Sequence, residues 1–237
     1  MTMPRISQRD DRIVATSVGA LYVLATAAGV AAVVVDAPID IASMAASKGA
    51  VLSTALLEIV MALAVTGVAV MLYPVLVADA RTRARRGLAL WYVATRIAEG
   101  TLFFVGVMLL AGMLTLSEAV AAGSVELAAS SGLTAALTAI HEYAWIAGQT
   151  VFCVGAAMLY VLLYLSRRVP RWLSLWGLIA APSMLIAGFL LPFTHDPISA
   201  QATILYAPMA VQEMVLAGWL VVRGFSTPAT GLERGTA

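Results

Sequence analysis

The chain has 237 residues, of which 62% are hydrophobic and only 11% are charged, and its formal net charge is +1. About a quarter of the residues of a soluble domain are charged, so this composition excludes an ordinary water-soluble protein and indicates a membrane protein. The near-neutral net charge gives no support for nucleic-acid binding. A single cysteine, Cys153, excludes an internal disulfide framework and a thiolate metal site within one chain.

Six apolar stretches are long enough to cross a hydrocarbon layer of roughly 30 Å, which takes about 20 helical residues. In chain order they cover residues 13–35, 51–76, 88–116, 134–165, 172–191 and 204–222. The first exceeds the apolar core of a cleaved signal peptide, roughly 7–15 residues, so we expect it to remain as a helix. Open strands would leave backbone groups without hydrogen bonds in lipid. The sequence therefore predicts an all-α polytopic membrane protein, a bundle of six transmembrane helices.

The distribution of arginine predicts the orientation of this bundle. With six crossings, twelve arginines fall on one side of the membrane, whereas the other side carries only Lys48. In bacterial inner-membrane proteins the side rich in Arg and Lys is cytoplasmic. We therefore expect both termini in the cytoplasm of a bacterial cell, with 1–12 as an N-terminal segment, 13–225 as the transmembrane domain and 226–237 as a disordered tail.

Two arginine clusters in the cytoplasmic connections also have the charge to contact anionic lipid headgroups. The alternative is that they act only as topology signals. The clusters are Arg81, Arg83, Arg85 and Arg86, and Arg167, Arg168 and Arg171.

Ionisable residues also occur inside the predicted spans, where Asp, Lys or Arg at mid-helix costs about 2.5–3.5 kcal/mol. Such residues must face the bundle interior, a water-filled cavity or one another. Arg96 and Glu99 are three residues apart and therefore neighbours on one helix face. Estimated depths place several candidates between the midplane and the outer face, where they could line one ligand- or proton-binding cavity. The candidates are Glu58, Arg96, Glu99, His141, Glu142, Gln149 and Glu213.

These candidates contain more acid than base. Four of them are carboxylates, Arg96 is the one obligatory cation, and His141 can become a second. Full ionisation would leave a net negative charge in a low-dielectric space, so at least one carboxyl should hold a proton, or a cation should bind. This excess favours a transporter-like or sensor-like protein. The structural alternative is that Arg96 and Glu99 form an ion pair that only specifies helix packing, as in a non-catalytic assembly subunit.

A metal-dependent membrane enzyme is a further alternative. His141, His195 and Asp196 could hold a zinc-like ion with an open position, and a neighbouring glutamate could act as general base. However, HEYAW at residues 141–145 lacks the second histidine of HExxH, and the sequence contains no P-loop or dinucleotide fingerprint. The sequence identifies no catalytic residue and no cofactor, which favours a protein that is not an enzyme.

Five segments carry a family resemblance: LYPVL (72–76), RIAEG (96–100), HEYAW (141–145), SRRVPRWLSLWGLIAAP (166–182) and APMAVQEMVLAGWLVVRGF (207–225). Through them the chain, from about residue 13 to 225, resembles the bacterial integral membrane proteins catalogued as domain of unknown function 4386. The resemblance implies a membrane protein of six or seven helices and implies no activity. Arg96, Glu99, His141 and Glu213 fall inside these segments.

Overall fold

The computed structural model describes residues 8–35, 37–194 and 200–226, so residues 227–237 of the expected tail and residues 1–7 lie outside it. In the described part of the chain all regular structure is helical. The elements are α1 (Gln8–Val35), α2 (Ile41–Met44), α3 (Lys48–Ala78), α4 (Arg83–Ala121), α5 (Leu127–Ser166), α6 (Arg171–Thr194) and α7 (Ala200–Val222). Six of them, all except α2, are long and apolar enough to cross a membrane. The predicted all-α fold with six membrane-spanning helices is therefore confirmed.

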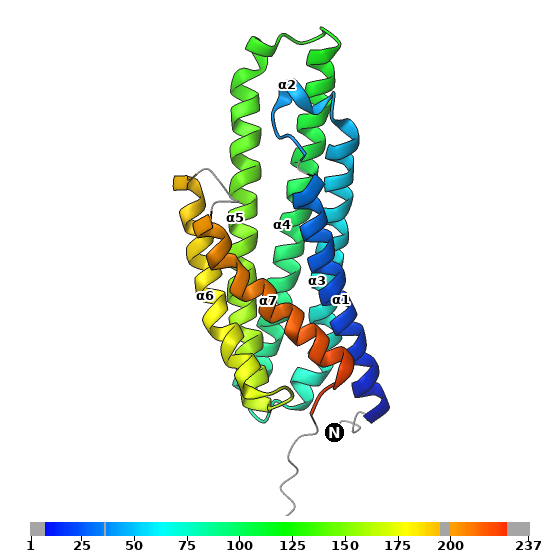
Figure 1. Ribbon diagram of the computed structural model, residues 1–237, viewed down its shortest axis with the longest axis vertical. Coiled ribbons are helices and arrows are strands. Elements are labelled where there is room, and N and C mark those ends of the chain that lie inside the picture. The colour runs from blue at the N-terminus through cyan, green and yellow to red at the C-terminus, as the bar shows by residue number, and fades with distance from the viewer. Residues whose placement is uncertain (1–7, 36, 195–199, 227–237) are drawn as a thin grey trace, which may run out of the picture.

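Each long helix extends beyond the apolar stretch that predicted it, at one end or both. The largest extensions belong to α4 and α5, with 39 and 40 residues. At 1.5 Å per residue each is roughly 60 Å long, about twice the thickness of a hydrocarbon layer. In Figure 1 both helices reach well beyond α6 and α7 at the top of the bundle. Apolar sequence marks only the part of a helix that contacts lipid, whereas backbone hydrogen bonding continues past it.

The six long helices form a closed ring (Figure 1). Each packs against the next in the order α1, α3, α4, α5, α6 and α7, and α7 packs back against α1. Gly19 lies at this closure. A Cβ atom there would stand 2.8 Å from the backbone oxygen of Ala217 on α7. The close approach of the first and last helices therefore requires a residue without a side chain.

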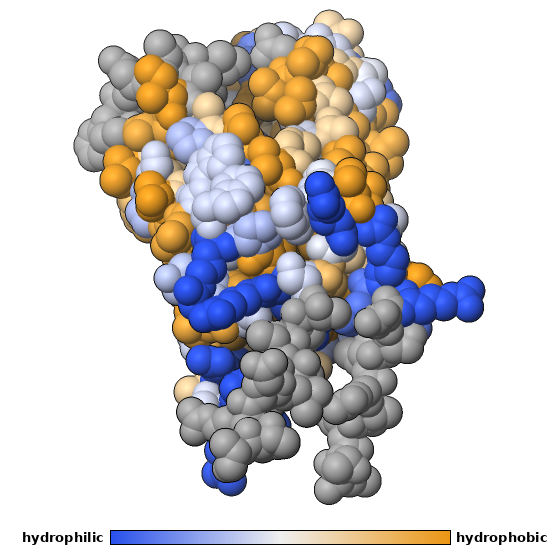
Figure 2. All heavy atoms as spheres, turned by 60° about the horizontal axis from the view of Figure 1, so that its bottom comes forward, coloured by the Kyte–Doolittle hydropathy of each residue, from blue (hydrophilic) through white to orange (hydrophobic). Residues whose placement is uncertain are grey.

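The arginine-rich connections gather at the bottom of Figure 1, where Figure 2 shows hydrophilic side chains below an apolar surface. Arg168, in the α5–α6 connection, is only 5% exposed. It donates to both carboxylate oxygens of Asp79, at 2.5 and 2.9 Å, and to Asp11 Oδ2 at 2.7 Å. Burial lowers the pKa of Arg168, but the hydrogen bonds to Asp79 and Asp11 outweigh it, so its pKa lies above the ordinary value. Arg168 thus ties this connection to α1 and to the end of α3.

At the opposite end, the short helix α2 is held against α4. Ser117 Oγ donates to the backbone oxygen of Ile41 at 2.5 Å and accepts from the backbone nitrogen of Ala45 at 2.8 Å. Lys48 Nζ contacts Glu118 Oε1 at 2.6 Å. A four-residue helix carries too little periodic pattern to be predicted, which is why α2 was not expected.

Candidate functional site

A buried group of charges occupies the interior of the ring. Arg96 is 1% exposed and Glu99 is 3% exposed, and Arg96 Nη1 donates to Glu99 Oε2 at 2.7 Å. Glu213 from α7 brings a second carboxylate, whose Oε1 lies 3.8 Å from Arg96 Nη2. We call Arg96, Glu99 and Glu213 the Arg96 triad. In it, one cation faces two carboxylates.

Aromatic rings cover the guanidinium of Arg96. Its Cζ atom lies 4.6 Å from the ring centroid of Phe152 on α5 and 5.8 Å from that of Tyr92, one turn earlier on α4. The negative faces of such rings attract a cation, and more strongly where water is excluded. The rings therefore help α4 and α5 hold a charged group away from solvent.

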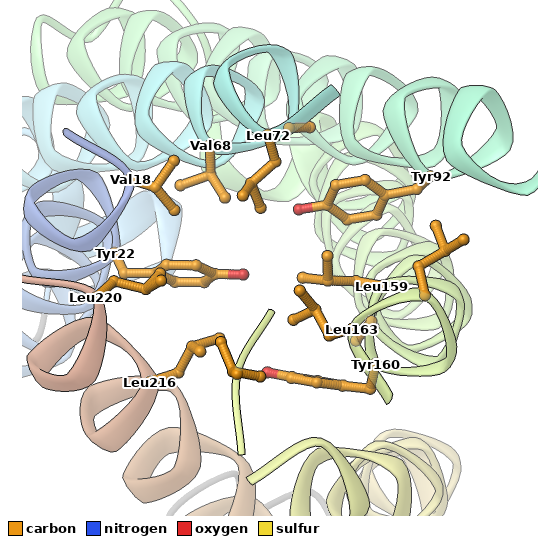
Figure 3. Packing of buried hydrophobic residues seen from close by; sticks show 14 of the residues in the cluster. Val18, Tyr22, Val68, Leu72, Tyr92, Leu159, Tyr160, Leu163, Leu216 and Leu220 are labelled. Atoms are coloured by element: carbon orange, nitrogen blue, oxygen red, sulfur yellow. The ribbon is translucent and has the colours of Figure 1, made fainter. Parts of the chain in front are cut away.

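Three buried tyrosines surround the Arg96 triad: Tyr22 on α1, Tyr92 on α4 and Tyr160 on α5. In Figure 3 the hydroxyls of Tyr22 and Tyr92 point into the middle of the bundle from different helices. Within the described residues, neither of these hydroxyls nor Arg96 Nε has a hydrogen-bond partner within 3.5 Å, although Tyr22 and Arg96 are polar neighbours of the Tyr92 hydroxyl. Buried polar groups are nearly always satisfied, so these atoms have unused capacity for water or a small polar ligand.

Two glutamines join α5, α6 and α7. Gln212 on α7 accepts from the Tyr160 hydroxyl at 2.5 Å and donates to the backbone oxygen of Leu173 at 3.1 Å. Gln149 on α5 donates to the backbone oxygen of Met184 at 2.6 Å and accepts from the Tyr206 hydroxyl at 2.8 Å. Each glutamine uses both ends of its amide, which indicates a role in holding α5, α6 and α7 together.

A second polar group lies further along α4, around Gly106. A Cβ atom on Gly106 would be 3.9 Å from Glu58 Oε2 on α3 and 3.9 Å from His141 Nε2 on α5. Gly106 lies seven residues, about 10 Å, beyond Glu99 along the helix axis. The structure thus separates the candidates into two groups instead of gathering them in one cavity. Arg96, Glu99 and Glu213 form the first, and Glu58 and His141 form the second.

The remaining candidates lie apart from both groups. Glu142 follows His141 on α5, is exposed, and interacts with His141 only electrostatically. His195 and Asp196 lie outside the described residues. Across residues 8–35, 37–194 and 200–226, no group of three His, Cys, Asp or Glu side chains is placed to hold a metal ion.

Comparison with known proteins identifies a family for this chain. The family described as Domain of unknown function (DUF4386) matches residues 17–224, which is most of the chain. The chain belongs to this family. No curated protein and no solved structure matches it. The family description names no activity.

Sequence reasoning missed Tyr22 and Tyr160, which surround the triad of the DUF4386 protein, and Phe152, which lies over the guanidinium of Arg96. Tyr160 follows Gln149 by eleven residues and Cys153 by seven, spacings that place all three on one face of α5, so following that face along the helix would have found it. Tyr22 is the only aromatic residue in an otherwise small and aliphatic span. No charge marks that span, and only the packing of α1 against α7 and α3 brings Tyr22 toward Arg96 and Glu213.

Proposed function

We propose that this DUF4386 protein is a transporter-like or sensor-like membrane protein whose Arg96 triad binds and releases one proton. The supporting observation is the unequal sharing of one guanidinium by a buried carboxylate, Glu99, and a partly buried one, Glu213. Glu99 accepts a charge-assisted hydrogen bond at 2.7 Å. The 3.8 Å contact of Glu213 is too long for a hydrogen bond. Glu213 is therefore the carboxylate that changes its protonation state.

Charge balance supports this assignment. Arg96 compensates one carboxylate, so with Glu99 and Glu213 both ionised the triad carries one uncompensated negative charge away from water. A proton on Glu213 removes that charge, and its side chain, 15% exposed, is less enclosed than that of Glu99 at 3%. The titratable groups that interact with Glu213 are Arg96 and Glu99 on α4, Tyr22 on α1, and Cys153 and Tyr160 on α5.

Infrared difference spectroscopy of the purified protein in lipid nanodiscs tests the assignment, because a protonated carboxyl has its own C=O band. We expect a pH-dependent band in the wild type that disappears in Glu213→Gln. Glu126→Gln, at an exposed position before α5, should keep the band. Persistence of the same band in Glu213→Gln would reject Glu213 as the proton-binding group.

We also propose that the protein lies in the bacterial inner membrane with both termini in the cytoplasm. The arginine-rich connections between α3 and α4 and between α5 and α6 lie at one end of the bundle (Figure 1), which supports this orientation. Arg168 is buried in ion pairs, so contact with anionic lipid headgroups would fall to the exposed arginines of the two clusters. These are Arg81, Arg83, Arg86, Arg167 and Arg171.

The metal-dependent enzyme remains an alternative without support from the described residues. It depends on His195 and Asp196, which lie outside them, in addition to His141. The assembly-subunit alternative makes a different prediction, since it requires the Arg96 triad for folding but not for proton binding.

A further inference from the structure

Glu58 is a mostly buried residue whose carboxylate has no cationic partner among the described residues. Its side chain lies in the interior at 8% exposure. No described residue gives it a hydrogen bond or an ion pair. Thr54, one turn earlier on α3, likewise has a buried hydroxyl without a hydrogen-bond partner among the described residues. An isolated buried carboxylate is costly, so its charge calls for a proton or a cationic partner.

A small pocket lies next to this carboxylate. It is lined by Glu58, Phe103, Gly106, His141, Trp145 and Gly148, among others, and has a volume of about 10 Å³. That is room for one body of the size of a water molecule. The rings of Phe103 and Trp145 meet edge to face, with centroids 5.7 Å apart. Trp145 is 42% exposed, so the pocket lies close to the surface of the bundle.

These groups match the chemistry of an ammonium group. An ammonium group can donate hydrogen bonds to Glu58 and to Nε2 of a neutral His141. Its positive charge compensates the negative charge of Glu58, and the aromatic rings attract it. Hard metal ions such as Ca²⁺ and Mg²⁺ take six or more oxygen ligands, waters included, whereas this pocket has room for one water-sized body and Glu58 is the only carboxylate among its lining residues. The one other charged group near His141 among the described residues is Glu142, which also favours a cation.

We propose that the Glu58 pocket binds an ammonium group, either the free ammonium ion or the head of a primary amine. The site is separate from the Arg96 triad, and the proposal does not rest on proton binding there. The amine can come from solution or from an ethanolamine lipid headgroup, which presents the same chemistry at the membrane surface.

The test is calorimetric titration of ammonium chloride into the purified full-length protein in phosphatidylcholine nanodiscs. We expect saturable binding of ammonium and methylammonium, and none of potassium or tetramethylammonium, since neither of these donates N–H hydrogen bonds. Glu58→Gln should weaken ammonium binding at least about tenfold through loss of a charge-assisted hydrogen bond.

A glycine pair on α4 supplies a matched control. Gly106→Ala places a methyl group between Glu58 and His141 and keeps both, so it should weaken binding by a similar factor. Gly112→Ala adds the same methyl group in open space and should bind like the wild type. This comparison stays decisive even if Glu58→Gln fails to fold.

Three results would overturn the proposal: no saturable ammonium binding by the wild type, equal binding of potassium, or wild-type affinity in both Glu58→Gln and Gly106→Ala. Nanodiscs containing phosphatidylethanolamine then identify the source of the amine. Competition that lowers the apparent affinity for ammonium assigns the pocket to a lipid headgroup, whereas unchanged affinity assigns it to a soluble amine. The ammonium titration and the lipid competition do not involve Glu213. A negative result in them would therefore reject the ammonium-binding proposal without affecting the proton-binding proposal.

Discussion

At the scale of single residues, a buried guanidinium is stable only while its carboxylates remain beside it. Replacing Arg96 by Gln would leave Glu99 and Glu213 without a cation, and breaking a buried ion pair in this way costs about 3–5 kcal/mol. We expect the midpoint of thermal unfolding to be lower than in the wild type. The unfolding is measured by tryptophan fluorescence of the protein in detergent. The double variant Arg96→Gln/Glu99→Gln should recover part of the loss, because Glu99 then no longer carries an unpaired charge. Purely additive losses would show that the two residues are not coupled.

Arg168 offers a second comparison at this scale, between two neighbouring arginines. Lysine keeps the charge but cannot reproduce the planar contact with both oxygens of Asp79 while reaching Asp11. Arg168→Lys should therefore cost about 2 kcal/mol and increase amide hydrogen exchange at the start of α1 and the end of α3. Arg167→Lys changes an exposed side chain and serves as the control. Equal exchange in the two variants would contradict the role assigned to Arg168.

At the scale of helices, the closure of the ring depends on the contact between α1 and α7. Gly19→Ala would place a methyl group 2.6 Å from the side chain of Val221 and 2.8 Å from the backbone oxygen of Ala217. Since backbone cannot move aside as a flexible side chain can, we expect a loss of about 1–3 kcal/mol, measured by thermal unfolding. Gly218→Ala, on α7 but with nothing within 4 Å, should be neutral or stabilising. A Gly19→Ala protein as stable as Gly218→Ala would show that this helix contact is loose.

At the scale of the whole molecule, the orientation in the membrane follows from which end carries the arginines. The only cysteine, Cys153, is buried, so a Cys153→Ala background allows single exposed reporters. Ser124→Cys lies between α4 and α5, and Ser226→Cys lies beyond α7 at the arginine-rich end. A membrane-impermeant maleimide should label position 124 in spheroplasts, which retain an intact inner membrane, and position 226 only after they are permeabilised. The reverse pattern would invert the proposed topology.

The six spans and the Arg96–Glu99 pair were determined by the sequence alone, because both depend on local properties. Apolar length decides whether a helix can cross lipid, and a spacing of three residues makes two side chains neighbours on any helix. The sequence also indicated that the interior carboxylates outnumber their cations. Those inferences required no knowledge of how the helices pack.

Only the tertiary structure decided which distant residues meet. Depth counted from the start of an apolar stretch suggested one cavity, but the helices extend past those stretches and α7 crosses the bundle obliquely (Figure 1). Glu213 therefore reaches Arg96, whereas Glu58 lies opposite His141 across Gly106. Arg168 likewise lies in a cationic cluster in the sequence and in an ion-pair network in the fold. The contacts of charged groups depend on the relative height and rotation of helices, and these are set by packing between segments far apart in the chain.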